Sequence, residues 1–185
     1  MEKRINLPIT RDMAREIKSG ESVLLSGTIY TARDAAHKRL VRLLENGEKL
    51  PFDIENATIY YVGPTPAKPG QAIGSAGPTT SYRMDAYSPA LIRAGETGMI
   101  GKGKRNAEVI NAMKEYGAVY FAAIGGAGAL LSSCIKSAEI VAYEDLGAEA
   151  VRRLTVEDFP VVCVIDSCGN NLYETGRKEY LDSDL

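Results

Sequence analysis

The sequence predicts an α/β protein that folds as a single compact domain over residues 1–185. Segments with the pattern of strands and segments with the pattern of helices are mixed along the whole chain. The expected strands are continuous apolar runs, which indicates that helices or a second sheet cover both of their faces. At 185 residues the chain is long enough to build one hydrophobic core.

The first third of the chain contains two expected helices and two expected strands. Thr10 suits the N-cap of the first helix, and Gly20 can stop that helix. The second helix has the strongest pattern, because its apolar residues recur at helical spacing and Gly47 follows them. These elements are expected at residues 10–19 (helix), 22–30 (strand), 31–45 (helix) and 58–62 (strand).

The middle of the chain, residues 71–104, is rich in glycine and has few long apolar runs. Irregular backbone of this kind between regular elements is usually a functional loop system or a linker. Regular structure is expected to resume after it. The expected elements are a helix at 107–116, strands at 118–124, 139–143 and 161–166, and a helix at 148–154 between the last two strands.

The composition argues against several classes of function. The formal net charge is −2, and without a basic surplus we expect no binding to nucleic acid or to an anionic membrane. The apolar runs are far shorter than the ~20 residues needed to span a bilayer. The first residues do not resemble a secretory signal, so a cytoplasmic location is expected.

The three cysteines are Cys134, Cys163 and Cys168. An odd number of cysteines in a chain without a signal argues against a disulfide framework. Their spacing matches no compact metal-ligand motif, and His37 is the single histidine. We expect free thiols and no metal site in this chain, so any cluster that the protein uses is held elsewhere.

Arg33 is the first candidate ligand-binding residue. Thr31 and Asp34 stand in the capping-box relation at an expected strand-to-helix transition, which would place Arg33 in the first helical turn. Free backbone N–H groups, the helix dipole and a guanidinium together suit a carboxylate. A solvated surface arginine is the alternative interpretation. His37 lies one turn later on the same face, either as a packed side chain or as a supporting group.

A second group of polar residues lies in the segment Gly-Pro-Thr-Thr-Ser-Tyr-Arg-Met-Asp, residues 77–85. Glycine permits the close approach of a ligand, and proline fixes φ. A hydroxyl held rigidly on such a turn can exchange a proton if nearby cations lower its pKa. The alternative is a structural turn whose hydroxyls bond to their own backbone. The candidates in this segment are Thr79, Thr80, Arg83 and Asp85.

A basic segment, Gly-Lys-Gly-Lys-Arg at residues 101–105, directly precedes an expected helix and contains the candidate Lys102. The segment has the character of an anion-binding loop, but it lacks the complete phosphate-loop pattern. A solvated basic turn is equally compatible with these residues.

Together these segments resemble the signature blocks of the class I (iron–sulfur) fumarate hydratase and L(+)-tartrate dehydratase family, in the domain that two-chain members carry as a separate β subunit. The blocks are, in order, TARDAAHKRL, GPTTSYRMD, GKGKR, IGGAGALL and DSCGNNLY. The resemblance covers nearly the whole chain and implies a swivelling β/β/α domain. It also implies a partner α subunit, in a complex such as one with two copies of each chain, whose cysteines hold a [4Fe–4S] cluster.

The resemblance also implies roles for individual residues. Arg33, Arg83 and Lys102 fall where the family binds its dicarboxylate substrate. Thr79 falls on the proposed proton-transfer threonine, which works with an acidic residue of the α subunit. The implied activity is the reversible hydration of fumarate to L-malate, by a β subunit that is active only with its α subunit. Residues that could support this site are His37, Thr80 and Asp85.

Two features bear on the choice of substrate. Lys102 to Arg105 keeps the Lys, Gly and Arg of the Lys-Gly-Asn-Arg loop usual in fumarases of this type, whereas the tartrate enzymes tend to lack that arginine. Thr-Thr-Ser before Tyr82 departs from the usual fumarase Thr-Thr-Ala and leans slightly toward tartrate. Fumarate is therefore the expected substrate, with tartrate as the alternative.

Two functions of other classes compete with this interpretation. The strand expected at 118–124 runs into Gly-Gly-Ala-Gly, which imitates a dinucleotide-binding unit. However, Leu131 stands at the position of the third small residue, and only about ten residues remain for the crossover helix. The other alternative is a structural subunit that merely stabilises its partner. Cations supplied by three separate segments weigh against that alternative.

Overall fold

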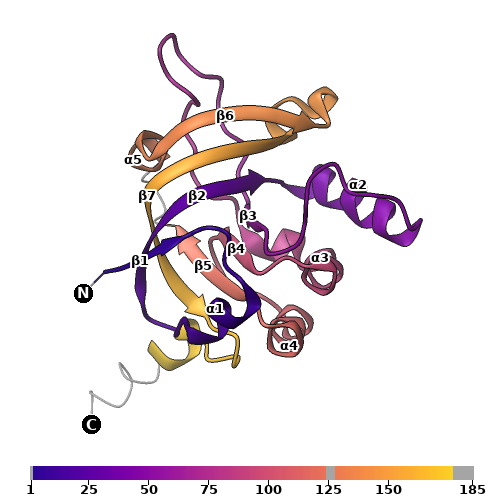
Figure 1. The fold of residues 1–185 in the computed structure, drawn as a ribbon, viewed down its shortest axis with the longest axis vertical. Helices are drawn as coiled ribbons and strands as arrows, with labels where there is room; N and C mark the ends of the chain where they lie inside the picture. Colours follow the sequence, from indigo (N-terminus) through magenta and orange to yellow (C-terminus); the bar gives the residue numbers. More distant parts are fainter. Residues whose placement is uncertain (1, 124–127, 177–185) are drawn as a thin grey trace.

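The computed structural model describes residues 2–123 and 128–176 (Figure 1). Its mixture of strands and helices confirms the α/β fold class. The strands are β1 (Lys3–Asn6), β2 (Ser22–Thr31), β3 (Thr58–Tyr60), β4 (Gly98–Gly101), β5 (Val119–Ala123), β6 (Ile135–Ala142) and β7 (Val151–Ile165). The α-helices are α1 (Arg11–Glu16), α2 (Asp34–Glu45), α3 (Ser88–Ala94), α4 (Ala107–Tyr116) and α5 (Gly128–Ser133), and the 3-10 helices are η1 (Ser81–Met84) and η2 (Glu144–Glu149).

Five strands close into a barrel. β2, β3, β4 and β5 pair in parallel, each with the next. The long β7 completes the ring, because it pairs antiparallel with β5 on one side and with β2 on the other. β1 extends the wall beside the start of β2, and β6 extends it beside the start of β7. The carboxyl ends of the four parallel barrel strands therefore meet at one rim.

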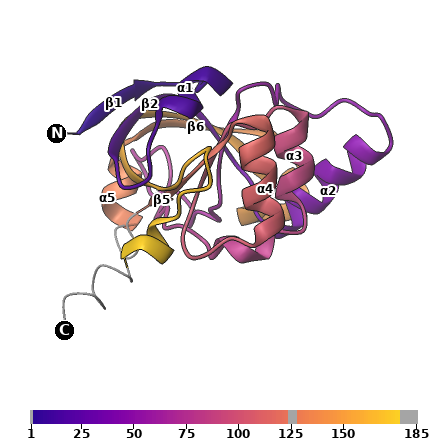
Figure 2. The same ribbon diagram turned by 90° about the horizontal axis from the view of Figure 1, so that it is seen from below.

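The barrel strands are buried on both faces, as their continuous apolar runs predict. Along β3, β4 and β5 alternate side chains belong to two separate apolar clusters. Tyr60, Ile100 and Phe121 lie in the cluster that includes the barrel interior. Alternating with them, Ile59, Met99 and Tyr120 pack toward the helices. Helices α2, α3 and α4 lie side by side against this outer face (Figure 2), so two β layers carry one helical layer.

Local sequence signals account for several elements. Thr10 caps α1, because its side chain accepts a hydrogen bond from the backbone N–H of Met13. The predicted helix at 107–116 is α4, which Asn106 caps and Gly117 ends in the left-handed conformation. The described residues contain no helix that is long and apolar enough to cross a membrane.

The glycine-rich middle is more regular than its composition predicts, because η1, α3 and β4 all lie within residues 71–104. β4 is buried along its whole length. Its glycines are required by close packing: a Cβ on Gly98 would lie 2.5 Å from Thr58 Oγ1, and one on Gly101 would meet the Ser81 side chain. A strand flanked by two such glycines carries little apolar pattern, which is why the sequence did not reveal it.

The predicted helix at residues 148–154 is wrong. Those residues form the end of η2 and the start of β7, a strand of 15 residues that also includes the predicted strand at 161–166. The first part of β7 lies between β2 and β6 and pairs with both. Pairing on two sides satisfies the backbone, and it outweighs the weak helical preference of the segment.

The arrangement around α5 does not match a dinucleotide-binding unit. Such a unit needs two neighbouring parallel strands joined by a crossover helix. Here β5 and β6 each pair with a different part of β7, and α5 has six residues. Residues 124–127, which hold most of the Gly-Gly-Ala-Gly segment, lie outside the described part of the chain.

Candidate functional site

The predicted site residues come from segments that leave the same barrel rim. Arg33 follows β2, and Lys102 follows β4, while β3 between them continues into the segment 61–63. The carboxyl ends of parallel strands are the usual place for ligand sites in α/β proteins. The topology therefore gathers residues from distant parts of the sequence at one edge.

Arg33 occupies the N-cap position of α2 and not its first turn. The predicted capping box is wrong, because Thr31 is the last residue of β2 and its hydroxyl bonds to β7. The buried Thr31 hydroxyl donates to the Ala150 carbonyl oxygen at 3.4 Å and accepts from the Arg152 N–H at 3.0 Å. The helix therefore begins with no side-chain cap.

The Arg33 side chain is largely covered, with 24% of it exposed, which argues against a solvated surface arginine. It lies across Gly63, where an added Cβ would be 2.6 Å from the Nη1 atom. Its Nε is 3.5 Å from Glu149 Oε1 and 3.9 Å from Asp34 Oδ2. Gly63 thus provides the space for the guanidinium, and two carboxylates lie within ion-pair distance of Nε, which donates no hydrogen bond to a described residue.

Asp34 joins Arg33 to Arg83. The Arg83 Nε donates a hydrogen bond of 2.9 Å to Asp34 Oδ1, and 44% of the Arg83 side chain is exposed. Asp34 engages Nε, and no hydrogen bond or ion pair to another described residue occupies the terminal nitrogens of Arg83, so they are available to a carboxylate. Sequence reasoning gave Asp34 only a capping role, and no local pattern could have shown its contact with a residue 49 positions away.

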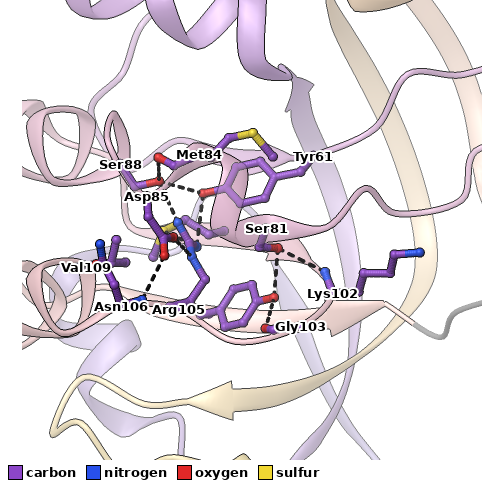
Figure 3. Close-up of polar contacts among 12 residues, drawn as sticks. Tyr61, Ser81, Met84, Asp85, Ser88, Lys102, Gly103, Arg105, Asn106 and Val109 are labelled. Carbon is purple, nitrogen blue, oxygen red and sulfur yellow. Dashed lines mark hydrogen bonds and ion pairs between the residues drawn. The ribbon is translucent and has the colours of Figure 1, made fainter.

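Thr79, Thr80 and Lys102 lie on a short extension of the sheet. The Thr79 N–H donates to the Tyr61 carbonyl oxygen at 2.7 Å, and Thr80 forms a parallel bridge with Lys102. The Ser81 N–H donates to the Lys102 carbonyl oxygen at 2.8 Å. These bonds fix the backbones of both predicted substrate-binding segments relative to each other. Lys102 is exposed, and its side chain extends away from the buried cluster in Figure 3.

His37 belongs to the start of α2 and is fully buried. Its Nδ1–H donates to the Arg33 carbonyl oxygen at 2.9 Å, and its ring packs edge-on against Tyr61. Burial lowers the pKa of His37 from 6.5 to about 4, despite the hydrogen bond to Arg33, which raises it. The imidazole is therefore neutral at pH 7. This geometry supports the packed interpretation, in which His37 contacts the backbone of a site residue.

Asp85 pairs with Arg105, and it is also the C-cap residue of η1. The Arg105 Nε donates to Asp85 Oδ1 at 2.7 Å, and the Asn106 N–H donates to Asp85 Oδ2 at 2.8 Å. Arg105 itself is buried. The arginine that distinguishes the predicted fumarase loop therefore lies inside the protein. Sequence reasoning treated Arg105 as part of a basic turn and missed its structural partners.

The cysteines do not form a metal site in the described residues. Cys163 lies in the barrel-interior cluster, where burial raises the pKa of its thiol to about 12. Cys134 is half-buried, and Cys168 is exposed. No group of three His, Cys, Asp or Glu side chains in residues 2–123 and 128–176 is arranged to hold a metal ion. These residues do not fit as ligands of an iron–sulfur cluster, and a cluster on a partner subunit stays a prediction.

Two further sequence blocks contact the rim. Of the IGGAGALL block, residues 124–127 lie outside the described residues, and Gly128 accepts a hydrogen bond of 3.3 Å from the Ala76 N–H. In the DSCGNNLY block, the Tyr173 hydroxyl accepts a hydrogen bond of 3.1 Å from the Gly103 N–H. The contacts place both blocks beside the loops that carry Thr79 and Lys102.

Comparison with known proteins identifies a family and several relatives. Residues 1–176 match the family model described as "Fumarase C-terminus". The chain is 43% identical over 152 residues to the aerobic class I fumarate hydratase of Escherichia coli (strain K12), a match that covers 81% of this chain and 28% of that protein. It is 37% identical over 183 residues to a putative class I fumarate hydratase of Geobacillus stearothermophilus, covering 96% of this chain and 35% of the relative.

A third relative has nearly the same length as this chain. The putative L(+)-tartrate dehydratase subunit beta of Methanocaldococcus jannaschii is 38% identical over 177 residues, covering 92% of this chain and 91% of that protein. The chain thus spans 28% and 35% of the two fumarate hydratases but nearly all of the tartrate dehydratase subunit.

Proposed function

We propose, because this chain belongs to the fumarase C-terminus family, that it is the β subunit of a hydro-lyase that acts on a small dicarboxylate. Relatives named fumarate hydratase and tartrate dehydratase support this reaction class. The observation that carries the proposal is the pair Arg33 and Arg83, joined by Asp34 at the barrel rim. In this proposal an α subunit completes the active site and holds the [4Fe–4S] cluster.

Arg33, Arg83 and Lys102 bind the substrate carboxylates. Arg33 is held between acidic side chains, Arg83 is held through Nε, and Lys102 is carried on a backbone that is bonded to the Thr80–Ser81 segment. Such cations need little reorganisation when an anion arrives. The addition of water to fumarate passes through an aci-carboxylate intermediate with extra negative charge. Cations preorganised around that charge lower the barrier to its formation.

Thr79 transfers the proton at the carbon next to the carboxylate. Its backbone is fixed by the bond to Tyr61, and it precedes the bridge between Thr80 and Lys102. A threonine hydroxyl is a weak base by itself, but nearby cations favour its deprotonated form. In the proposed complex an acidic residue of the α subunit works with Thr79, and Thr80 supports its position.

Fumarate is the proposed substrate, and L(+)-tartrate is the second candidate. This chain retains the Lys, Gly and Arg of the fumarase-like loop. Its Arg105 acts on substrate choice only through the shape of the loop, because the side chain is buried. The match to nearly the full length of a tartrate dehydratase subunit favours the second candidate. Both reactions use the same carboxylate-binding cations.

Turnover by the complex with its cognate α subunit, prepared without oxygen, tests the proposal. We expect hydration of fumarate by the complex and none by the isolated chain. Activity on tartrate alone would keep the reaction class and change the substrate. A complex that turns over neither compound would contradict the proposed function.

Thr79→Val tests the proposed proton transfer, because it removes the hydroxyl and keeps the shape of the side chain. We expect kcat to fall by at least about 100-fold while the complex still assembles, since general acid–base groups contribute roughly that much or more. The matched control is Thr28→Val, at an exposed threonine of β2. Near-normal turnover by the Thr79 variant would refute the role of this residue.

Arg33→Ala separates a catalytic subunit from a merely structural one. A charge-assisted hydrogen bond is worth about 1.5–3 kcal/mol, so kcat/KM should fall by roughly 10- to 150-fold. A subunit that only stabilises its partner predicts almost no change in turnover once the complex has formed.

A further inference from the structure

A buried arginine lies beneath the two loops that carry the proposed substrate-binding residues. The Arg105 side chain is 0% exposed, and Figure 3 shows it surrounded by polar partners. Its Nε donates to Asp85 Oδ1 at 2.7 Å, and one terminal nitrogen donates to Ser88 Oγ at 2.7 Å. The other terminal nitrogen lies 3.3 Å from the Tyr61 hydroxyl oxygen. One side chain thus contacts the segment after Arg83 and the segment after β3.

The Asp85 carboxylate binds the end of the Lys102 loop, the segment between β4 and α4, where that loop meets α4. Its Oδ2 accepts a hydrogen bond of 2.8 Å from the Asn106 N–H, while its Oδ1 binds Arg105. Asn106 is also the N-cap of α4, since its side chain accepts a bond of 2.9 Å from the Val109 N–H. At its α4 end, the Lys102 loop is therefore held in two ways. Asn106 caps the helix, and both Arg105 and Asn106 bind Asp85.

Two tyrosine rings complete this arrangement. The Arg105 guanidinium carbon is 5.2 Å from the centre of the Tyr61 ring and 5.0 Å from that of Tyr120. The Tyr120 hydroxyl donates to the Gly103 carbonyl oxygen at 2.8 Å and lies 2.9 Å from Ser81 Oγ. Ser81 Oγ in turn accepts a bond of 3.0 Å from the Lys102 N–H. The same cluster therefore reaches the backbone on both sides of Lys102.

We infer that Arg105 and Asp85 form a positioning pair, which holds the Lys102 loop in register with the segment 79–83. The inference rests on the proposed function, because it assigns the pair a task in the site of that function. A buried ion pair is a weak source of stability, since desolvation of both charges opposes their attraction. Its effect here is geometric: it joins the segment that contains Thr79 and Arg83 to the loop that contains Lys102. Arg105 and Asp85 are positioning residues and do not touch the substrate.

The variant that tests this inference removes both charges at once. Arg105→Met alone would leave the Asp85 carboxylate buried and unpaired, which is strongly destabilising. The double variant Asp85→Asn with Arg105→Met avoids an unpaired charge, so its melting temperature should stay close to that of the natural chain. In the complex with the α subunit, kcat/KM should fall by about 10- to 100-fold, because small displacements of binding groups are costly. Arg153→Gln, which breaks the exposed pair with Glu139, is the control and should leave turnover unchanged.

Hydrogen exchange tests the pair independently of turnover. The amides of Ser81, Lys102 and Asn106 are bonded within this cluster, and all three should exchange at least about tenfold faster in the double variant. Unchanged exchange of these amides would overturn the inference, even if the complex is active. Should the double variant fail to fold, Ser88→Ala removes one neutral partner of Arg105. A smaller acceleration at the same amides would then support the inference, and none would refute it.

A mutant cycle with Lys102 separates positioning from general loss of structure. In the natural complex Lys102→Ala should lower kcat/KM by roughly 10- to 150-fold. If the pair acts by placing Lys102, the same substitution in the double variant should cost much less. Equal losses in both backgrounds would overturn the inference. If the natural complex turns over neither fumarate nor tartrate, the proposed function fails instead, and the exchange measurement still decides whether the pair orders the loops.

Discussion

Glu96→Gln should stabilise the chain at alkaline pH and leave its stability nearly unchanged in acid. Glu96 is fully buried between α3 and β4, and neither of its carboxylate oxygens has a hydrogen-bond partner among the described residues. Burial raises the pKa of Glu96 from 4.5 to about 8, although the Arg105 cation opposes that shift. The folded chain therefore holds a proton on Glu96 at neutral pH, whereas the unfolded chain does not.

The size of the effect follows from this difference in pKa. The pKa of Glu96 is higher in the folded chain than in the unfolded chain. The buried carboxyl group therefore does not lower the unfolding free energy below about pH 4.5, and it lowers that free energy progressively as the pH rises through about 8. Each unit of pKa difference corresponds to about 1.4 kcal/mol. The loss is thus about 3 kcal/mol at pH 7 and about 5 kcal/mol above pH 8. A neutral glutamine at position 96 has no such pH dependence.

Urea unfolding of the purified chain, followed by circular dichroism at pH 4.5 and pH 9, measures the change. The difference in unfolding free energy between Glu96→Gln and the natural chain should grow from near zero to about 5 kcal/mol. Glu115→Gln, at an exposed glutamate, is the control and should show no such growth. A difference that is the same at both pH values would refute the reasoning, because it would mean that Glu96 ionises normally in the folded state.

Three further predictions concern stability. Burial lowers the pKa of His37 from 6.5 to about 4, so stability should be lost as the pH falls from 6.5 through 4, by up to about 3 kcal/mol. His37→Asn should flatten this loss in urea unfolding at pH 7 and pH 4, and an unchanged slope would contradict the cause. Gly101→Ala would bring a Cβ against Ser81 Oγ and should lower stability by about 1–3 kcal/mol, whereas Gly176→Ala, with open space around it, should not. Thr31→Val leaves the Arg152 N–H without its partner and should cost about 1–3 kcal/mol; a neutral result would mean that the hydroxyl is not needed at the end of β2.

Local patterns predicted the elements that depend on neighbours in sequence. The helix at 107–116 has a clear apolar face, a capping residue before it and a glycine after it, and the structure shows it with the same bounds. The strand at 22–30 has branched residues and lies in the barrel wall. At residues 148–154 the local pattern favoured a helix. The pairing of β7 with both β2 and β6 decided otherwise.

In the candidate site, too, local patterns predicted some features, and contacts between distant segments decided others. The types and order of Arg33, Thr79, Arg83 and Lys102 could be read from the sequence, because they lie in short motifs that resemble a known family. Their separate roles stay proposals. The sequence did not show that Asp34 joins the two arginines, or that Asp85 binds Arg105 and not Arg83. Each of these carboxylates could pair with many cations of the sequence, and only the positions of the residues in the folded chain decide which cation it binds.

The sequence by itself determined the α/β class, the family and the types of the residues proposed to bind a dicarboxylate, because these properties depend on composition and short motifs. The tertiary structure decided how the strands close into a barrel and which rim collects the cations. It also decided that Arg105 is buried while Lys102 is exposed, although the two are three residues apart. Closure of the barrel brings β2, β3 and β4 to one edge, and contacts between segments far apart in sequence then set the burial and the partner of each charge.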